Sequence, residues 1–84
     1  MRLFPNPTRQ YIIVEYNLME KGLNANKIIL EINSIQGYII ESRKLVKNQD
    51  QVLIITNFYK PGKYICVLKV NGKIIDSVSF IIIQ

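Results

Sequence analysis

The chain has 84 residues and a formal net charge of +5, and 49 % of its residues are apolar, which allows one small domain, excludes two, and argues against disorder. Isoleucine, valine and tyrosine are frequent whereas alanine occurs once, and this bias predicts strands rather than helices. The basic residues are scattered, with only Arg43 and Lys44 adjacent. This pattern favours solvated lysines on exposed strand faces over a nucleic-acid-binding patch.

The residues that most often carry out catalysis or bind metals are scarce. The chain has no histidine, and its six carboxylates follow no spacing that brings them to one site. The single cysteine, Cys66, excludes an intramolecular disulfide and shares a predicted strand face with Tyr64 and Leu68, so we expect a buried, inert thiol. We therefore expect no enzyme, no cofactor and no metal site. No apolar run reaches the roughly 20 residues that a membrane helix needs.

The first half of the chain predicts an extended, proline-rich opening over residues 1–10, followed by three strands. The strands are predicted over 11–16, 27–33 and 38–43, the last with an irregular extension to residue 46. Gly37 closes a short hairpin turn with positive φ. The residues expected to face the core of the first two strands are Ile12, Val14, Tyr16, Leu18, Ile28, Leu30 and Ile32.

Three segments of the chain are harder to interpret. Residues 18–26 fit either a helical turn or a loop. Residues 47–51 are polar and predict a turn. Residues 52–56 are apolar on both faces, as in a strand that is covered on both sides or in an edge strand that a partner covers.

The last third of the chain gives the clearest pattern. Pro61-Gly62 predicts a type II turn, residues 64–70 predict a strand, and Asn71-Gly72 predicts a type I′ hairpin turn because both central residues need positive φ. The final strand is predicted over residues 74–83. Its inward residues are expected to be Val78, Phe80 and Ile82, and its outward residues Ile75, Ile81 and Ile83. Ile81 and Ile83 then offer an unpaired or lightly covered edge, which could add a partner strand or self-associate.

Six or seven short strands, with turn signals every 8–12 residues or so, predict an all-β fold, a small antiparallel β-sandwich that forms one domain over residues 1–84.

Three motifs, in this order, resemble the C-terminal sorting domain of the type IX secretion system, the Por secretion-tail family of Bacteroidetes. Residues 3–7, Leu-Phe-Pro-Asn-Pro, are similar to the opening of that domain. Residues 32–40 are similar to its strand–turn–strand segment. Residues 58–65 resemble its Leu-x-x-Gly-x-Tyr-aliphatic signature, with one extra residue before the glycine. The family often has a basic residue at the start of the last strand, where this chain has Asp76-Ser77-Val78-Ser79.

The resemblance implies an immunoglobulin-like sandwich of seven strands that follows a larger exported cargo. In such a protein the domain is a signal that the outer-membrane translocon and its carrier protein read. A sortase-like signal peptidase then removes it, and the cargo passes from the periplasm to the cell surface or is secreted. The residues that we expect to take part in recognition are Pro5, Asn6, Pro7, Gly37, Gly62, Tyr64, Ile81 and Ile83.

Two other functions fit parts of the pattern. The same fold and the positive charge are also typical of an immunoglobulin-like module for adhesion or glycan binding, which would gather Lys44, Lys47, Lys60 and Lys63 on one surface. A small barrel that binds nucleic acid through its tyrosines is the weaker alternative, and only Tyr38 and Tyr59 lie beside turns where they could stack on bases.

Overall fold

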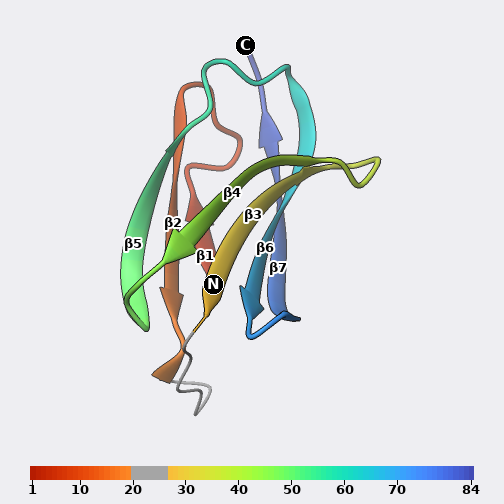
Figure 1. The fold of residues 1–84 in the computed structure, drawn as a ribbon. Coiled ribbons are helices and arrows are strands. Elements are labelled where there is room, and N and C mark those ends of the chain that lie inside the picture. The colour runs from red at the N-terminus through yellow and green to blue at the C-terminus, as the bar shows by residue number, and fades with distance from the viewer. Residues whose placement is uncertain (20–26) are drawn as a thin grey trace.

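A computed structural model describes residues 1–19 and 27–84 and contains seven strands in two sheets (Figure 1). The predicted all-β sandwich is therefore confirmed. The strands are β1 (Arg2–Phe4), β2 (Tyr11–Asn17), β3 (Ile28–Ser34), β4 (Ile39–Leu45), β5 (Gln49–Ile55), β6 (Gly62–Val70) and β7 (Lys73–Ile82). The described residues contain no helix that is long and apolar enough to cross a membrane.

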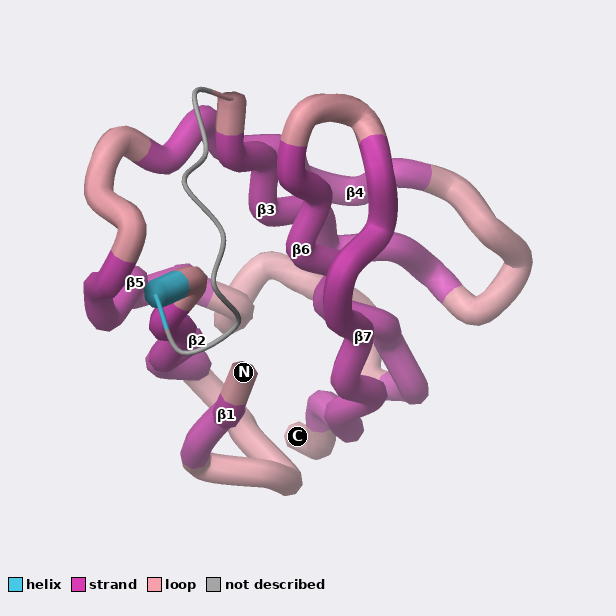
Figure 2. The backbone as a smooth tube through the Cα atoms, turned by 90° about the horizontal axis from the view of Figure 1, so that it is seen from below, coloured by secondary structure: helices cyan, strands magenta, loops and turns pink. Residues whose placement is uncertain are grey.

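One sheet has the strand order β1-β2-β5 and the other has the order β4-β3-β6-β7, and all of these pairs are antiparallel. Figure 2 looks at the molecule from below and separates the two layers, with β1, β2 and β5 on one side. The division of strands one, two and five from strands three, six and seven is that of an immunoglobulin-like sandwich. Here the fourth strand pairs with the third.

The core lies between the sheets and is built by the alternation of side chains along each strand. All seven residues predicted to face inward from the first two strands are buried, and so are Tyr64, Cys66, Leu68 and Val70 of β6. Because these strands pair in register, each inward side chain meets inward neighbours from the adjacent strand, as Leu30 does with Leu68. The sequence alternation therefore predicts the core correctly in β2, β3 and β6.

The last strand changes faces part-way along its length. A register shift places Asp76 opposite Leu68 but Ile74 opposite Lys69, so Ile75 is the extra residue of a bulge. Phe80 and Ile82 are buried and Ile81 and Ile83 are exposed, as predicted. The prediction that Ile75 faces outward is wrong, because the bulge turns its side chain to pack against the core.

The turns agree with the sequence at two places and differ at a third. Asn71 and Gly72 have φ of 51° and 85°, and Gly37 has φ of 95°, which confirms both hairpin predictions. The predicted type II turn at Pro61-Gly62 is wrong. The Tyr59 N–H donates to the Thr56 carbonyl at 2.9 Å, so the chain reverses earlier. Gly62, with φ of 150°, already pairs with Ile82 in the sheet.

Two strands differ from the sequence prediction. The predicted polar turn over residues 47–51 is wrong in its second half, because Gln49, Asp50 and Gln51 pair with β2 as the start of β5. Strand β5 is an edge strand, and its outward Leu53 and Ile55 are exposed, so it is not covered on both sides. Strand β1 was not predicted within the extended opening. Most of the ambiguous segment 18–26 lies outside the described residues, although Leu18 is buried as predicted.

Candidate recognition surface

The proline-rich opening lies along the end of the last strand. The Thr8 N–H donates to the Ile81 carbonyl and the Ile83 N–H donates to the Thr8 carbonyl, both at 2.9 Å. Thr8 is buried, forms a parallel bridge with Ile82, and its hydroxyl donates to the Tyr11 carbonyl. We call residues 5–8 the opening segment. Of the two predicted states of the edge at the end of β7, unpaired or lightly covered, the structure shows the second, because this segment pairs with it.

Asn6 supplies through its side chain what the prolines on either side cannot supply through the backbone. Proline has no N–H, so Pro5 and Pro7 cannot donate to β7. The Asn6 Oδ1 accepts a 3.0 Å hydrogen bond from the Ile81 N–H, while its Nδ2 lies 3.5 Å from the Ser79 carbonyl oxygen. The carboxamide thus faces β7 with its acceptor and its donor, as a peptide group of a neighbouring strand would. Both prolines follow cis peptide bonds.

A shallow hollow lies on the surface beside the opening segment and the end of the chain. It has a volume of about 420 Å³ and is lined by residues 5 and 7–11 and by Ile83. The side chains of Ile81 and Ile83 remain 45 % and 39 % exposed although their backbone is paired. The Arg9 guanidinium donates to the Gln84 carbonyl at the rim. This surface therefore combines proline rings and isoleucine side chains that a protein partner could bind.

The three other predicted recognition residues lie around the same end of the sandwich. Gly62 pairs with Ile82, and Tyr64 pairs with Phe80 on β7 and with Ser34, where the turn containing Gly37 begins. Tyr64 is 8 % exposed, its ring lies 5.8 Å from that of Phe80, and its hydroxyl donates to the Lys60 carbonyl at 2.6 Å. Tyr64 therefore stabilises this end of the sandwich through buried contacts.

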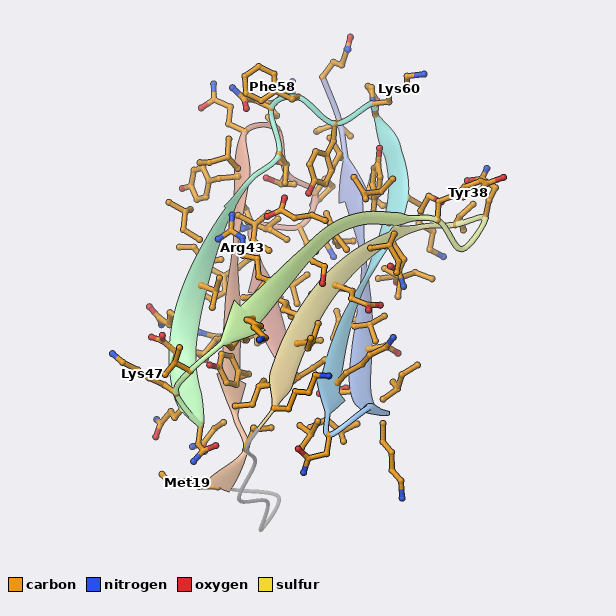
Figure 3. The ribbon with its side chains drawn as sticks, in the orientation of Figure 1. Met19, Tyr38, Arg43, Lys47, Phe58 and Lys60 are labelled. Atoms are coloured by element: carbon orange, nitrogen blue, oxygen red, sulfur yellow. The ribbon has the colours of Figure 1, made fainter. Side chains whose placement is uncertain are left out.

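A polar network that the sequence does not predict closes one side of the sandwich. The Tyr59 hydroxyl donates to Glu41 Oε1 at 2.6 Å, and the Arg43 Nε donates to Glu41 Oε2 at 2.7 Å. Arg43 also donates from Nη1 to the Leu53 carbonyl at 2.9 Å, which joins β4 to the edge of β5 (Figure 3). Burial and then the bond to Glu41 raise the pKa of the Tyr59 hydroxyl. The network forms because two edge strands lie close together in space, and no local sequence pattern indicates that.

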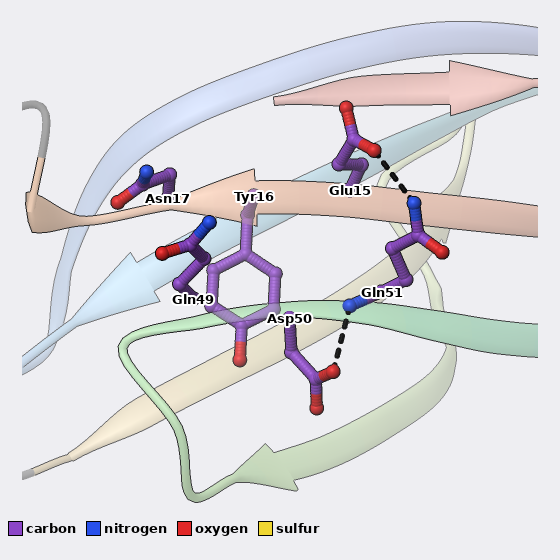
Figure 4. A pocket seen from close by; sticks show the side chains of 6 residues that line it. All are labelled: Glu15, Tyr16, Asn17, Gln49, Asp50 and Gln51. Atoms are coloured by element: carbon purple, nitrogen blue, oxygen red, sulfur yellow. Dashed lines mark hydrogen bonds between the residues drawn. The ribbon is translucent and has the colours of Figure 1, made fainter.

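A second hollow at the opposite end of β2 carries two carboxylates. Glu15 Oε2 accepts from the Gln51 side chain at 2.7 Å, and Asp50 Oδ1 accepts from the Gln51 N–H at 2.8 Å (Figure 4). Tyr16 lines the same hollow, and its hydroxyl donates to the Lys47 carbonyl at 2.6 Å. Within residues 1–19 and 27–84, no three His, Cys, Asp or Glu side chains lie close enough together to hold a metal ion.

The lysines of the glycan-binding alternative do not share one surface. Figure 3 places Lys60 at the end that carries the opening segment and Lys47 toward the other end of the molecule. Lys63 belongs to β6 beside Lys60, whereas Lys44 lies on β4 near Lys47. The charges are therefore divided between two ends.

Comparison with known families decides what this arrangement belongs to. The model of the secretion system C-terminal sorting domain, the Por secretion tail, matches residues 2–84. The chain belongs to this family. No curated protein and no solved structure matches the chain.

Membership gives this sandwich its general function. A secretion-tail domain is a type IX sorting signal, and the family is not a catalytic one. A protein that carries it is a secreted or surface cargo, and the signal acts by interaction with the secretion machinery. The match runs from β1 through the end of β7, so it includes the opening segment as well as both sheets.

Proposed function

We propose that residues 1–84 form one folded C-terminal signal that the type IX translocon and its outer-membrane carrier protein bind while the cargo is in the periplasm. A sortase-like signal peptidase then removes the signal from the upstream cargo, which becomes attached to the cell surface or is released. The family match and a self-contained core of buried residues from both sheets support this proposal.

The surface that the machinery reads is, in this proposal, the opening segment together with the end of β7. The observation that carries it is the hydrogen bond from the Ile81 N–H to Asn6 Oδ1. This bond joins a residue near the start of the matched region to one near its end, so the surface exists only in the folded domain. A partner that binds Pro5, Pro7, Ile81 and Ile83 would distinguish a complete domain from an unfolded or truncated one.

Gly37, Gly62 and Tyr64 act in recognition by holding this end in shape. The turn at Gly37, the pairing of Gly62 with Ile82 and the ring contact of Tyr64 position the start of β6, which pairs with the end of β7. Substitution of these residues would therefore impair folding and recognition together. The exposed side chains of Ile81 and Ile83 are better probes, because they can be changed with little effect on the core.

The test is export of a reporter. Residues 3–84 are fused behind a periplasmic reporter protein in a bacterium with a type IX secretion system, and the reporter is measured in the periplasm and outside the cell. We expect export with the native domain. A reporter that stays in the periplasm although the domain is folded would contradict the proposal. Leu30→Asp, which places a charge in the core, is the unfolded control and should abolish export.

A further inference from the structure

Two loops at the end of the molecule that carries the start of β6 present exposed apolar side chains. One is the β3–β4 turn with the start of β4, where Tyr38 is 71 % exposed and Ile35, Ile39 and Ile40 are also exposed. The other follows β5 and contains Phe58, which is 90 % exposed. Figure 3 shows Phe58, Lys60 and Tyr38 projecting outward from the molecule on these loops. We call residues 35–40 and 58–63 the loop surface.

The loop surface is also basic. A hollow of about 360 Å³ is lined by Ile35 and Ile40 together with Lys60 and Lys63. Both lysines are exposed. Neither loop contains an aspartate or a glutamate. The nearest carboxylate along the chain, Glu41, is already bonded to Arg43 and Tyr59. The positive charge of the loop surface is therefore not neutralised within its own loops.

We propose that the loop surface binds the surface of an anionic lipid bilayer. Tyrosine is favoured at the boundary between headgroups and acyl chains, where its ring is apolar and its hydroxyl is hydrated. Phenylalanine and isoleucine side chains contribute affinity in proportion to the apolar area that enters the boundary. Lysines beside them keep their ammonium groups among the lipid phosphates while their stems cover apolar surface.

A bilayer fits this arrangement better than an acidic protein does. The apolar side chains come from two separate loops and project into solvent, with Phe58 and Tyr38 on different loops. A fluid boundary adapts to projecting side chains, whereas a folded partner would need a matching depression for each of them. The inference does not depend on the proposed recognition surface, because the end of β7 and the loop surface use different side chains.

The experiment measures co-sedimentation of the 84-residue chain with vesicles. One set of vesicles contains equal parts of phosphatidylcholine and phosphatidylglycerol, and the other contains phosphatidylcholine alone. We expect binding to the anionic vesicles that weakens at high salt. Lys60→Ser with Lys63→Ser should weaken that binding by about fivefold for each lysine removed. Tyr38→Ser with Phe58→Ser should weaken it several-fold at either salt concentration.

Matched controls lie at the other end of the molecule. Lys44→Ser with Lys47→Ser removes the same charge, and Val46→Ser removes an apolar side chain that is 93 % exposed. These variants should bind the anionic vesicles within about twofold of the native chain, since screened charges far from the surface contribute little. Urea unfolding at an unchanged midpoint establishes that each variant is folded.

Three results would overturn the inference. The first is absence of native binding to the anionic vesicles. The second is a loss of vesicle binding in the Lys44 and Lys47 variant as large as that in the Lys60 and Lys63 variant, which would assign the effect to net charge. The third is saturable binding of a poly-glutamate peptide without binding to vesicles, which would assign the loop surface to an acidic protein partner.

Discussion

The hydroxyl of Tyr59 donates a 2.6 Å hydrogen bond to Glu41 Oε1 and so ties the loop after β5 to β4. The ring of the same tyrosine lies 5.5 Å from that of Tyr64, which packs on Phe80 in the core. One side chain therefore links the core to the polar network that closes the open side of the sandwich. The bond is important because β4 and β5 are edge strands of different sheets and do not pair.

Replacing Tyr59 with phenylalanine should lower the free energy of unfolding by about 1–2 kcal/mol, since a partly buried hydrogen bond to a charged group is lost while the ring stays. Urea unfolding followed by circular dichroism measures the change. Tyr38→Phe is the matched control, because it removes a hydroxyl from an exposed ring. Equal stability of the Tyr59 and Tyr38 variants would contradict the assigned role of the Glu41 bond.

Asn6→Ala should destabilise the chain by about 1 kcal/mol, because the Ile81 N–H loses its acceptor. Asn6→Asp keeps that acceptor and should have a smaller effect. Hydrogen exchange at the Ile81 amide reports the bond directly and should accelerate in Asn6→Ala. Asn57→Ala, in the exposed turn after β5, serves as control and should leave exchange at Ile81 unchanged. An unchanged Ile81 amide in Asn6→Ala would show that the side chain does not hold β7.

The sequence predicts the parts of the fold that local chemistry dictates. Alternation fixes the inward faces of β2, β3 and β6, and Asn71-Gly72 fixes the last hairpin. The sequence does not predict the bulge at Ile75, since a bulge depends on how two strands pair. The motifs also contain Pro5, Asn6 and Pro7, which the structure places beside the end of β7. They do not reveal that Asn6 would occupy the edge of β7, because that contact joins residues 75 positions apart.

Gly72→Ala should lower the free energy of unfolding by about 1–2 kcal/mol through backbone strain alone. Gly72 has φ of 85°, and no heavy atom lies within 4 Å of where a Cβ would be, so no clash contributes. Gly72→Asn should cost less, because asparagine tolerates positive φ better than alanine does. The comparison requires only urea unfolding of the two variants. A larger loss in Gly72→Asn than in Gly72→Ala would rule out strain as the cause.

Stability should fall at alkaline pH because of Cys66. Burial, and then the charge of Asp76, raises the pKa of the thiol from 9.0 to about 12. The folded state therefore keeps the proton that the unfolded chain releases above its lower pKa. The stability that the protonated thiol contributes is fully present below pH 9.0 and is lost as the pH rises toward the pKa of the folded state. The free energy of unfolding should therefore fall by about 1 kcal/mol per pH unit between about pH 9 and 10.

Cys66→Ala tests this origin of the pH dependence. The variant should be less stable at every pH because it leaves a small cavity, but its stability should fall less steeply between about pH 8 and 10. The measurement is urea unfolding across that range. Equal slopes in the variant and the native chain would mean that the thiol does not carry the effect.

The most direct test of the recognition surface compares two substitutions on one strand. Ile81→Asp and Ile74→Asp each place a carboxylate at an exposed position of β7, the first beside the opening segment and the second at the other end of the strand. Both are introduced into the reporter fusion, after urea unfolding has established that the two domains are equally stable. Ile81→Asp should hold the reporter in the periplasm, while Ile74→Asp should export it as the native domain does. Export of both reporters to the same extent would contradict the assignment of recognition to this end of β7.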